Sequence, residues 1–251
     1  MKSVNAVTIK ELYDLSHTEA KPLMEQYTYP WEVLPHIGEF IVKLGESLPK
    51  EEYTEVAEHV WVHKTAKVFA SAYLAGPAII GAETEVRQCA FVRGNALVGK
   101  GCVIGNSTEL KNVIIFDNVQ VPHYNYVGDS ILGFKSHMGA GSITSNVKSD
   151  KTLVHVKGID PETNEKFDLE TGLKKFGAML GNHVEVGCNS VLNPGTVIGS
   201  NSNVYPLSPV RGFVPAESIY KTGGVIVKKH AEVVSLYQSG QIVLPGGRLP
   251  V

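Results

Sequence analysis

The sequence predicts an all-β protein built as a parallel β-helix, a prism of stacked coils, with a helical arm before it. The first observation is a strict repeat, in which nine successive sixth residues are aliphatic: Val62, Val68, Leu74, Ile80, Val86, Val92, Val98, Ile104 and Leu110. The second is a small or β-branched residue four positions later in each unit, as in Ala66, Ala72 and Ala78. A period of six fits neither an α-helical face nor simple strand alternation, and it is typical of hexapeptide β-helices.

Four regions can be told apart along the chain. Residues 1–55 lack the hexad and show helical spacing, with Trp31, Leu34, Ile37, Ile41 and Leu44 on one face, so they are expected to form a helical arm or linker. Residues 56–204 are expected to form the β-helix. Its register slips near Pro122, which we interpret as a loop or bent corner. Residues 148–176 lack the repeat and predict an inserted loop or hairpin, which in repeat proteins often lies on the binding face. Residues 205–251 contain prolines that disfavour strands and are expected to form an irregular tail.

Composition limits the classes of function. The chain has 251 residues, 43% of them hydrophobic, and a formal charge of −2, so it can bury a core and has no cationic excess for nucleic acid. No apolar run approaches the roughly 20 residues of a membrane span, and the start lacks a signal-peptide stretch, so a cytoplasmic protein without a membrane partner is expected. Three cysteines without C-x-x-C spacing predict buried thiols, no disulfide framework and no metal.

A chain of motifs is more specific than the hexad. GNSTELKN at 105–112 is followed by PHYNYVGDSILGFKSHMGAGSITSN at 122–146. With these motifs, the stretch from Arg93 to Ile198 resembles the acetyltransferase domain of the bifunctional enzyme N-acetylglucosamine-1-phosphate uridyltransferase/glucosamine-1-phosphate acetyltransferase, a hexapeptide acyltransferase. The resemblance implies a left-handed β-helix, a homotrimer, acetyl-CoA as co-substrate and an amino-sugar 1-phosphate as acceptor.

The resemblance also implies two histidines in catalysis. His123 stands where the family has the general base that takes the proton of the sugar amine. Histidine suits this task because its ordinary pKa of about 6.5 leaves much of it neutral near pH 7. His137 replaces a family Asn that contacts the amine, so it is expected to assist or orient, and the acceptor sugar can differ. The alternative for His123 is a buried structural histidine.

The remaining implied site residues bind the substrates. Arg93, Lys111 and Lys175 match cations that hold the sugar phosphate in the family. The planar guanidinium of arginine and the compact ammonium of lysine both suit phosphate oxygens. Sugar contacts are implied for Glu109, Tyr126 and Asn146. On the cofactor side Ala140 is retained and Cys188 replaces a family Ser, and backbone amides near Ala140 are expected to steady the oxyanion. The alternatives are solvated charges on a prism face and simple turn residues.

Two departures weaken a direct transfer of activity. Tyr205-Pro206 replaces a small-residue pair of the family, and its bulk can block the pantetheine path. The chain also has no room for a nucleotidyltransferase domain before the first coil near residue 57, so it is expected not to be bifunctional, and such an enzyme becomes a candidate separate partner.

Three other classes of function stay open. A trimer that binds a sugar phosphate or nucleotide sugar without catalysis would keep the cations and lose the CoA end. A metal hydrolase would need His123, His137, His155 and His183 to approach one another across subunits. A purely structural trimer would use none of these residues.

Overall fold

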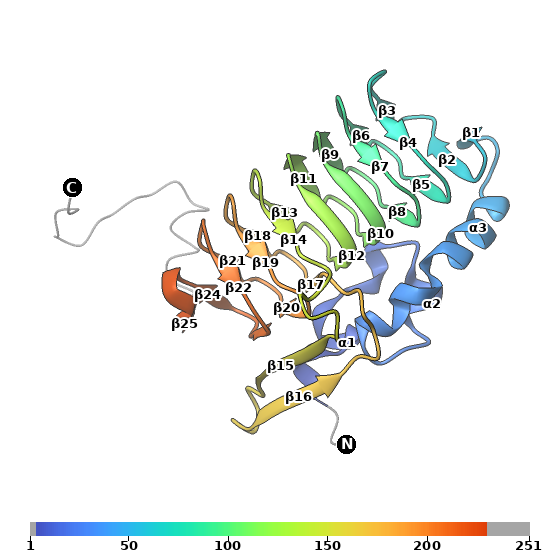
Figure 1. Ribbon diagram of the computed structural model, residues 1–251. Coiled ribbons are helices and arrows are strands. Elements are labelled where there is room, and N and C mark those ends of the chain that lie inside the picture. Colours follow the sequence, from blue (N-terminus) through green and yellow to red (C-terminus); the bar gives the residue numbers. More distant parts are fainter. Residues whose placement is uncertain (1–3, 230–251) are drawn as a thin grey trace, which may run out of the picture.

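The computed structural model describes residues 4–229 and confirms the predicted parallel β-helix with an N-terminal helical segment (Figure 1). Each full coil contributes one short strand to each of three faces, and equivalent strands of successive coils pair in parallel. A fold of this kind buries one aliphatic side chain per face and coil, which explains the period of six.

Three faces result, and they are named here in the order in which a coil passes through them. The first face contains β2 (Val60–His63), β5 (Ala78–Ile80), β8 (Ala96–Val98), β17 (Ala178–Leu180), β20 (Thr196–Ile198) and β23 (Phe213–Val214). The second face contains β3 (Lys67–Val68), β6 (Glu85–Val86), β9 (Val103–Asn106), β11 (Gln120–His123), β13 (His137–Met138), β18 (Glu185–Val186), β21 (Asn203–Val204) and β24 (Ser218–Tyr220). The third face contains β4 (Tyr73–Leu74), β7 (Phe91–Val92), β14 (Ile143–Thr144), β19 (Val191–Leu192) and β22 (Pro209–Val210).

Two longer strands explain the slip of the hexad. β10 (Glu109–Ile115) and β12 (Tyr126–Leu132) run from the third face into the first without a break. Glu109 pairs with Phe91, 18 residues earlier, whereas Val113 pairs with Ala96, 17 residues earlier, so this corner is one residue shorter. The same shortening recurs in β12. The slip therefore comes from two tight corners, at Asn112 and Asp129, and not from a loop at Pro122, which lies inside β11.

The hexad positions form the core as expected. Ile80, Val86, Val92 and Ile104 are completely buried, as are the hydroxyl-bearing residues Thr84 and Thr108 in the small-residue positions, while Val68 in the first coil is 37% exposed. Thr84 Oγ1 donates to Gly99 O at 2.7 Å, and Thr108 Oγ1 donates to Val121 O at 2.8 Å. Small polar residues fit these corners because the next coil supplies an acceptor for each hydroxyl.

The cysteines differ from the expectation of buried thiols. Cys102 is buried, and burial raises the pKa of its thiol to about 12. Cys89 and Cys188 are exposed because they occupy the outer corner between the second and third faces, where side chains point to solvent. All three are free cysteines.

The N-terminal arm covers the first face. It consists of 3₁₀ helices at Asn5–Val7, Leu15–His17 and Pro30–His36 and of helices α1 (Ile9–Leu12), α2 (Lys21–Met24) and α3 (Ile37–Ser47), and β1 (Tyr53–Ala57) then pairs antiparallel with β2. α3 lies against β5, β8 and β10. Its approach is close, since a Cβ added at Gly45 would stand 2.2 Å from the Trp61 ring.

The insertion is a β-hairpin made of β15 (His155–Ile159) and β16 (Lys166–Glu170). Its two ends meet, because Val147 forms a β-bridge with Lys175 and Phe176 N donates to Asn146 O at 2.9 Å. The hairpin therefore leaves the prism at the corner between the third and first faces and returns to the same place.

Regular coils continue beyond the boundary at residue 204 that the sequence predicts. β22, β23 and β24 extend the faces to Tyr220, a 3₁₀ helix spans Thr222–Gly224, and β25 (Ile226–Lys228) pairs antiparallel with β24. Pro209 is tolerated because its ring stands on the outer surface, where β22 is the last strand of the third face. The expected irregular tail is thus wrong for 205–220, and residues 230–251 lie outside the described part. No helix within residues 4–229 is long and apolar enough to cross a membrane.

Candidate active site on the third face

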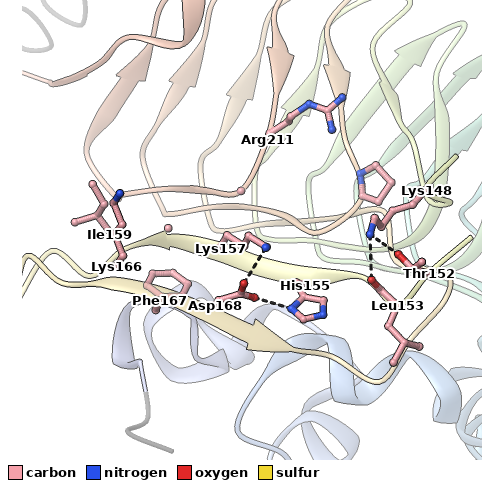
Figure 2. A pocket seen from close by; sticks show the side chains of 13 residues that line it. Lys148, Thr152, Leu153, His155, Lys157, Ile159, Lys166, Phe167, Asp168 and Arg211 are labelled. Carbon is pink, nitrogen blue, oxygen red and sulfur yellow. Dashed lines mark hydrogen bonds and ion pairs between the residues drawn. The ribbon is translucent and has the colours of Figure 1, made fainter. Parts of the chain in front are cut away.

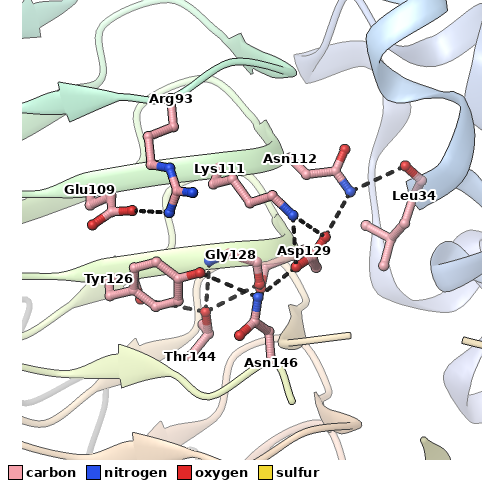
Figure 3. A network of polar contacts seen from close by, with 11 residues as sticks. Leu34, Arg93, Glu109, Lys111, Asn112, Tyr126, Gly128, Asp129, Thr144 and Asn146 are labelled. Carbon is pink, nitrogen blue, oxygen red and sulfur yellow. Dashed lines mark hydrogen bonds and ion pairs between the residues drawn. The ribbon is translucent and has the colours of Figure 1, made fainter. Parts of the chain in front are cut away.

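Most of the predicted acceptor residues converge on the outer surface of the third face (Figure 3). Arg93 follows β7, while Glu109 and Lys111 lie on β10 and Tyr126 on β12. Glu109 pairs directly with Tyr126 in register. Arg93 Nη1 donates to Glu109 Oε1 at 2.7 Å, and Glu109 raises the pKa of the Arg93 guanidinium. Three stacked coils thus place a cation, a carboxylate and a phenol side by side.

Asp129 links the rest of this group. Its residue exposure is only 3%, and its carboxylate accepts from Lys111 Nζ at 3.3 Å, Asn112 Nδ2 at 3.0 Å and Asn146 Nδ2 at 2.6 Å. Asn146 Nδ2 also donates to Tyr126 Oη at 3.2 Å, and Asn112 Nδ2 donates to Leu34 O of the arm at 3.3 Å. The carboxylate therefore holds two neighbouring side chains of β10 and one side chain from the coil of β14, and through Asn112 it also supports the contact between arm and prism.

Electrostatics keep the phenol neutral. Burial raises the pKa of Tyr126, and the neighbouring carboxylates Asp129 and Glu109 raise it further. A neutral Tyr126 hydroxyl can donate to or accept from a sugar hydroxyl at any pH near neutrality.

The third predicted cation also lies near this group. Lys175 is exposed and forms its β-bridge with Val147, next to Asn146. No hydrogen bond or ion pair of its ammonium group occurs within residues 4–229. Lys111 can also donate to a ligand, because its ammonium group has three N–H donors and its contact with Asp129 is long, at 3.3 Å.

His123 stands at the corner between the second and third faces. It ends β11, is exposed, and precedes Tyr126 on the third face by three residues. The buried Asn125 fixes this corner: its Oδ1 accepts from His123 N at 3.1 Å, and its Nδ2 donates to Gly139 O at 2.9 Å. The exposure of His123 contradicts the alternative of a buried structural histidine.

The predicted cofactor residues continue down the same corner. Gly141 N donates to His123 O at 3.0 Å, Asn189 N donates to Ala140 O at 2.9 Å, and Leu207 N donates to Cys188 O at 2.9 Å. His123, Ala140 and Cys188 therefore form one ladder, one residue per coil. Tyr205 and Pro206 occupy the next coil, and Tyr205 is 43% exposed.

His137 does not join His123 within one protomer. It begins β13 and pairs with Gln120, whereas His123 ends β11 three residues further along, about 10 Å at the usual strand rise. His137 Nδ1 lies 2.9 Å from Glu185 Oε2, in a cavity of about 570 Å³ shared with Asn118 and Gln120.

The histidines that a metal hydrolase would use are also separate. His155 lies on the hairpin beside Asp168, and His183 is on the next coil after His137. Nowhere in the described range 4–229 do three His, Cys, Asp or Glu side chains cluster as a metal would need.

Sequence reasoning missed two members of the network. Asp129 and Asn112 both lie in the motifs at 105–112 and 122–146, but neither the repeat nor the resemblance predicts a role for them. Both adopt positive φ, 48° for Asp129 and 56° for Asn112, at the shortened corners. The slip in the hexad was the signal, because the two tight corners bring these short polar side chains within hydrogen-bonding distance of each other.

Comparison with known proteins gives the family. The family model described as the GMPPB C-terminal domain matches residues 74–200. The chain belongs to this family. It is also 29% identical to the Bifunctional protein GlmU of Methanococcus maripaludis strain C5 over 224 residues, which is 87% of the chain and 52% of that relative. The GlmU of Methanococcus vannielii is 36% identical over 141 residues, 56% of the chain and 32% of that protein.

The chain thus spans about half the length, or less, of the curated relatives it matches. Homology to GlmU confirms the resemblance that the motifs predicted. Among solved structures, a hexapeptide transferase family protein from Anaplasma phagocytophilum is 15% identical, with 72% of this chain and 86% of that chain covered and a TM-score of 0.37.

Proposed function

We propose that this protein is an acetyl-CoA-dependent N-acetyltransferase that acts on an amino-sugar 1-phosphate, with His123 as general base. One observation carries the proposal. The acceptor-type residues lie across the third face, and His123 stands at the edge of that face, where the ladder to Ala140 and Cys188 begins. A sugar on the face and a thioester along the corner would meet at His123.

In the proposed reaction the sugar amine attacks the thioester carbonyl while His123 takes the amine proton. The nitrogen–carbon bond forms, the carbon–sulfur bond breaks, and CoA leaves as a thiol that receives a proton. The Ala140 N–H, which donates to no group within residues 4–229, is available to stabilise the oxyanion. Asn106 pairs with His123 in register, and its buried Oδ1 has no partner in the same range, so it can hold one imidazole N–H and present the other nitrogen to the amine.

The sugar phosphate is assigned to Arg93, Lys111 and Lys175. Arg93 uses one of its five donors on Glu109, and Lys111 touches Asp129 only at 3.3 Å or more, so both retain donors for phosphate oxygens. Glu109, Tyr126 and Asn146 are left for sugar hydroxyls. His137 is assigned an orienting role only from a neighbouring subunit, because its own protomer keeps it away from His123.

A homotrimer would complete this site. Tyr73 and Phe91 are 64% and 39% exposed, and their rings pack edge to face at 5.8 Å on the third face, while Tyr124 at the His123 corner is 66% exposed. A stripe of exposed aromatic residues marks a contact surface. Burying it against a second prism would place that neighbour beside His123.

A second candidate is a trimer that binds sugar phosphate or nucleotide sugar without transfer. The ladder beyond Cys188 favours it, because the exposed Tyr205 and Leu207 stand where the pantetheine arm would run. In that case a separate nucleotidyltransferase is the proposed partner.

Turnover with a panel of acceptors separates these candidates. We expect an acetylated product, detected by mass spectrometry, with glucosamine-1-phosphate or galactosamine-1-phosphate and acetyl-CoA. Thiol reagents are unsuitable because Cys89 and Cys188 are exposed. His123→Ala should slow product formation by about 10²–10⁴-fold, and His183→Ala, which removes another exposed histidine, should leave the rate unchanged. No product from any amino-sugar phosphate, with the sugar phosphate still raising the Tm, would replace the transferase by the binding protein.

A further inference from the structure

A groove of about 970 Å³ lies between the inserted hairpin and the last coils (Figure 2). β15 and β16 form one wall, and the corner after β22, with Arg211, forms the other. None of the residues assigned above to acetyl transfer lines it. Pockets that hold small organic ligands measure about 300–1,000 Å³. The groove is therefore large enough for a ligand of its own.

The groove is strongly cationic. Lys148, Lys157, Lys166 and Arg211 line it with one carboxylate, Asp168, and Asp150 pairs with Lys148 at 3.4 Å beside the lining, so four positive charges stand against two negative ones, or +2. The whole chain carries −2. In the part of the chain that the structure describes, neither Lys166 nor Arg211 has a hydrogen bond or ion pair for its charged group. Unpaired like charges around one concavity create a positive potential that an anionic ligand relieves.

The lining carboxylate positions two of the basic side chains. Asp168 Oδ2 accepts from Lys157 Nζ at 2.8 Å, and Asp168 Oδ1 lies 2.6 Å from His155 Nδ1. Lys157 and then His155 lower the pKa of Asp168. Because β15 and β16 pair in register with Lys157 opposite Asp168, the cation is held toward the groove.

The two walls are fixed relative to each other. A Cβ added at Gly195 would stand 2.5 Å from His155 O, and one added at Gly212 would stand 2.5 Å from Lys157 O. The backbone of β15 therefore rests directly on the corners of the last coils, and only glycine permits this approach at φ of 82° and 71°. The groove is preformed.

Apolar side chains lie beside the cations. Phe167 and Pro194 line the groove, as do Leu153 and Ile159, which are 36% and 50% exposed. This mixture suits a ligand that joins several phosphate charges to a flat organic ring. We propose that the groove binds a nucleoside diphosphate, free or joined to a sugar, with its phosphates on Lys157, Arg211 and Lys148 and its nucleoside against Phe167 and Pro194.

Calorimetric titration of the full chain tests this without turnover, so its failure is distinct from failure of the proposed transfer. The probes are UDP, GDP, UDP-N-acetylglucosamine, GDP-mannose, pyrophosphate and CoA. Saturable binding of a nucleoside diphosphate, free or sugar-linked, is expected. The double variant Lys157→Gln/Arg211→Gln should weaken it by about tenfold or more, whereas Lys43→Gln/Lys100→Gln, which removes the same charge outside the groove, should change it by less than about twofold.

Lysine labelling locates the ligand independently. Under reductive methylation, bound nucleotide should protect Lys148 and Lys157 and leave Lys43 unprotected. Equal affinity in the wild type and the groove variant, or equal loss in both double variants, would overturn the proposal. So would loss of CoA binding alone in the groove variant, because the groove would then belong to the co-substrate. If pyrophosphate binds as tightly as the nucleotides do, the groove does not recognise the nucleoside, and the proposal of a nucleoside diphosphate is overturned.

Discussion

At the scale of single residues, the third face depends on a carboxylate that no motif marked as functional. Asp129 accepts three hydrogen bonds from Lys111, Asn112 and Asn146 while it is almost completely buried. An ionised carboxylate has only acceptors, so it can satisfy three donors at once. The resemblance of the motifs to the acetyltransferase family implied roles for most of the polar residues around it. It did not predict their hub, because the contacts depend on a corner shortened by one residue.

Asp129→Asn tests this hub. Asparagine has the same shape but turns one acceptor into a donor, which would face the Nδ2 group of Asn146 or the Nζ group of Lys111. We expect the free energy of unfolding to fall by about 1–3 kcal/mol in urea titrations. Glu39→Gln removes a carboxylate from an exposed ion pair and should cost less than about 1 kcal/mol. Equal effects of the two substitutions would mean that Asp129 does not hold the network together.

At the scale of elements, the repeat alone does not predict how the inserted hairpin is arranged at the corner between the third and first faces. The insertion was expected as a loop or hairpin at 148–176, and the structure makes it a hairpin that docks on its own coils. The hexad predicts strands and their inward side chains. It does not predict the docking, which depends on glycines far from the hairpin in sequence.

Gly212→Ala measures how firmly the hairpin docks. Gly212 and Gly172 share a φ of 71°, but a Cβ at Gly172 meets nothing within 4 Å, whereas one at Gly212 would meet Lys157 O at 2.5 Å. Gly172→Ala should therefore cost about 1 kcal/mol for the left-handed backbone alone. Gly212→Ala should cost a further 1–3 kcal/mol, roughly, for the overpacking, as measured by urea unfolding.

Nucleotide affinity supplies a second readout of the same pair. The Gly212 variant should weaken binding in the groove and the Gly172 variant should not, because only the former moves the Lys157 wall. Identical stabilities and affinities of the two variants would show that the hairpin is not fixed by this contact.

At the scale of the whole molecule, the prism sets residues far apart in sequence into vertical rows. Each coil repeats the same corner, so His123, Ala140 and Cys188 align by coil number. The alignment was predictable in outline from the repeat and the motif order. The separation of His137 from His123 was not predictable. The motifs resemble those of a site that the family builds from more than one subunit, and the sequence of one chain does not say which residues come from which subunit.

The trimer is testable at this scale. Light scattering after size exclusion should give three times the 27.2 kDa of one chain. Phe91→Asp places a charge in the exposed aromatic stripe and should lower the mass, whereas Phe69→Asp, on the second face, should not. A monomeric mass for the wild-type chain would remove the shared site and with it the role given to His137.

The central claim is that the third face binds the acceptor and that His123 deprotonates it. The most direct test is the steady-state rate of acetyl transfer, measured as a function of acceptor concentration. His123→Ala should lower kcat by about 10²–10⁴-fold with little change in acceptor KM. Lys111→Gln should raise the acceptor KM by about tenfold and change kcat less. The account is contradicted if His123→Ala keeps the wild-type kcat.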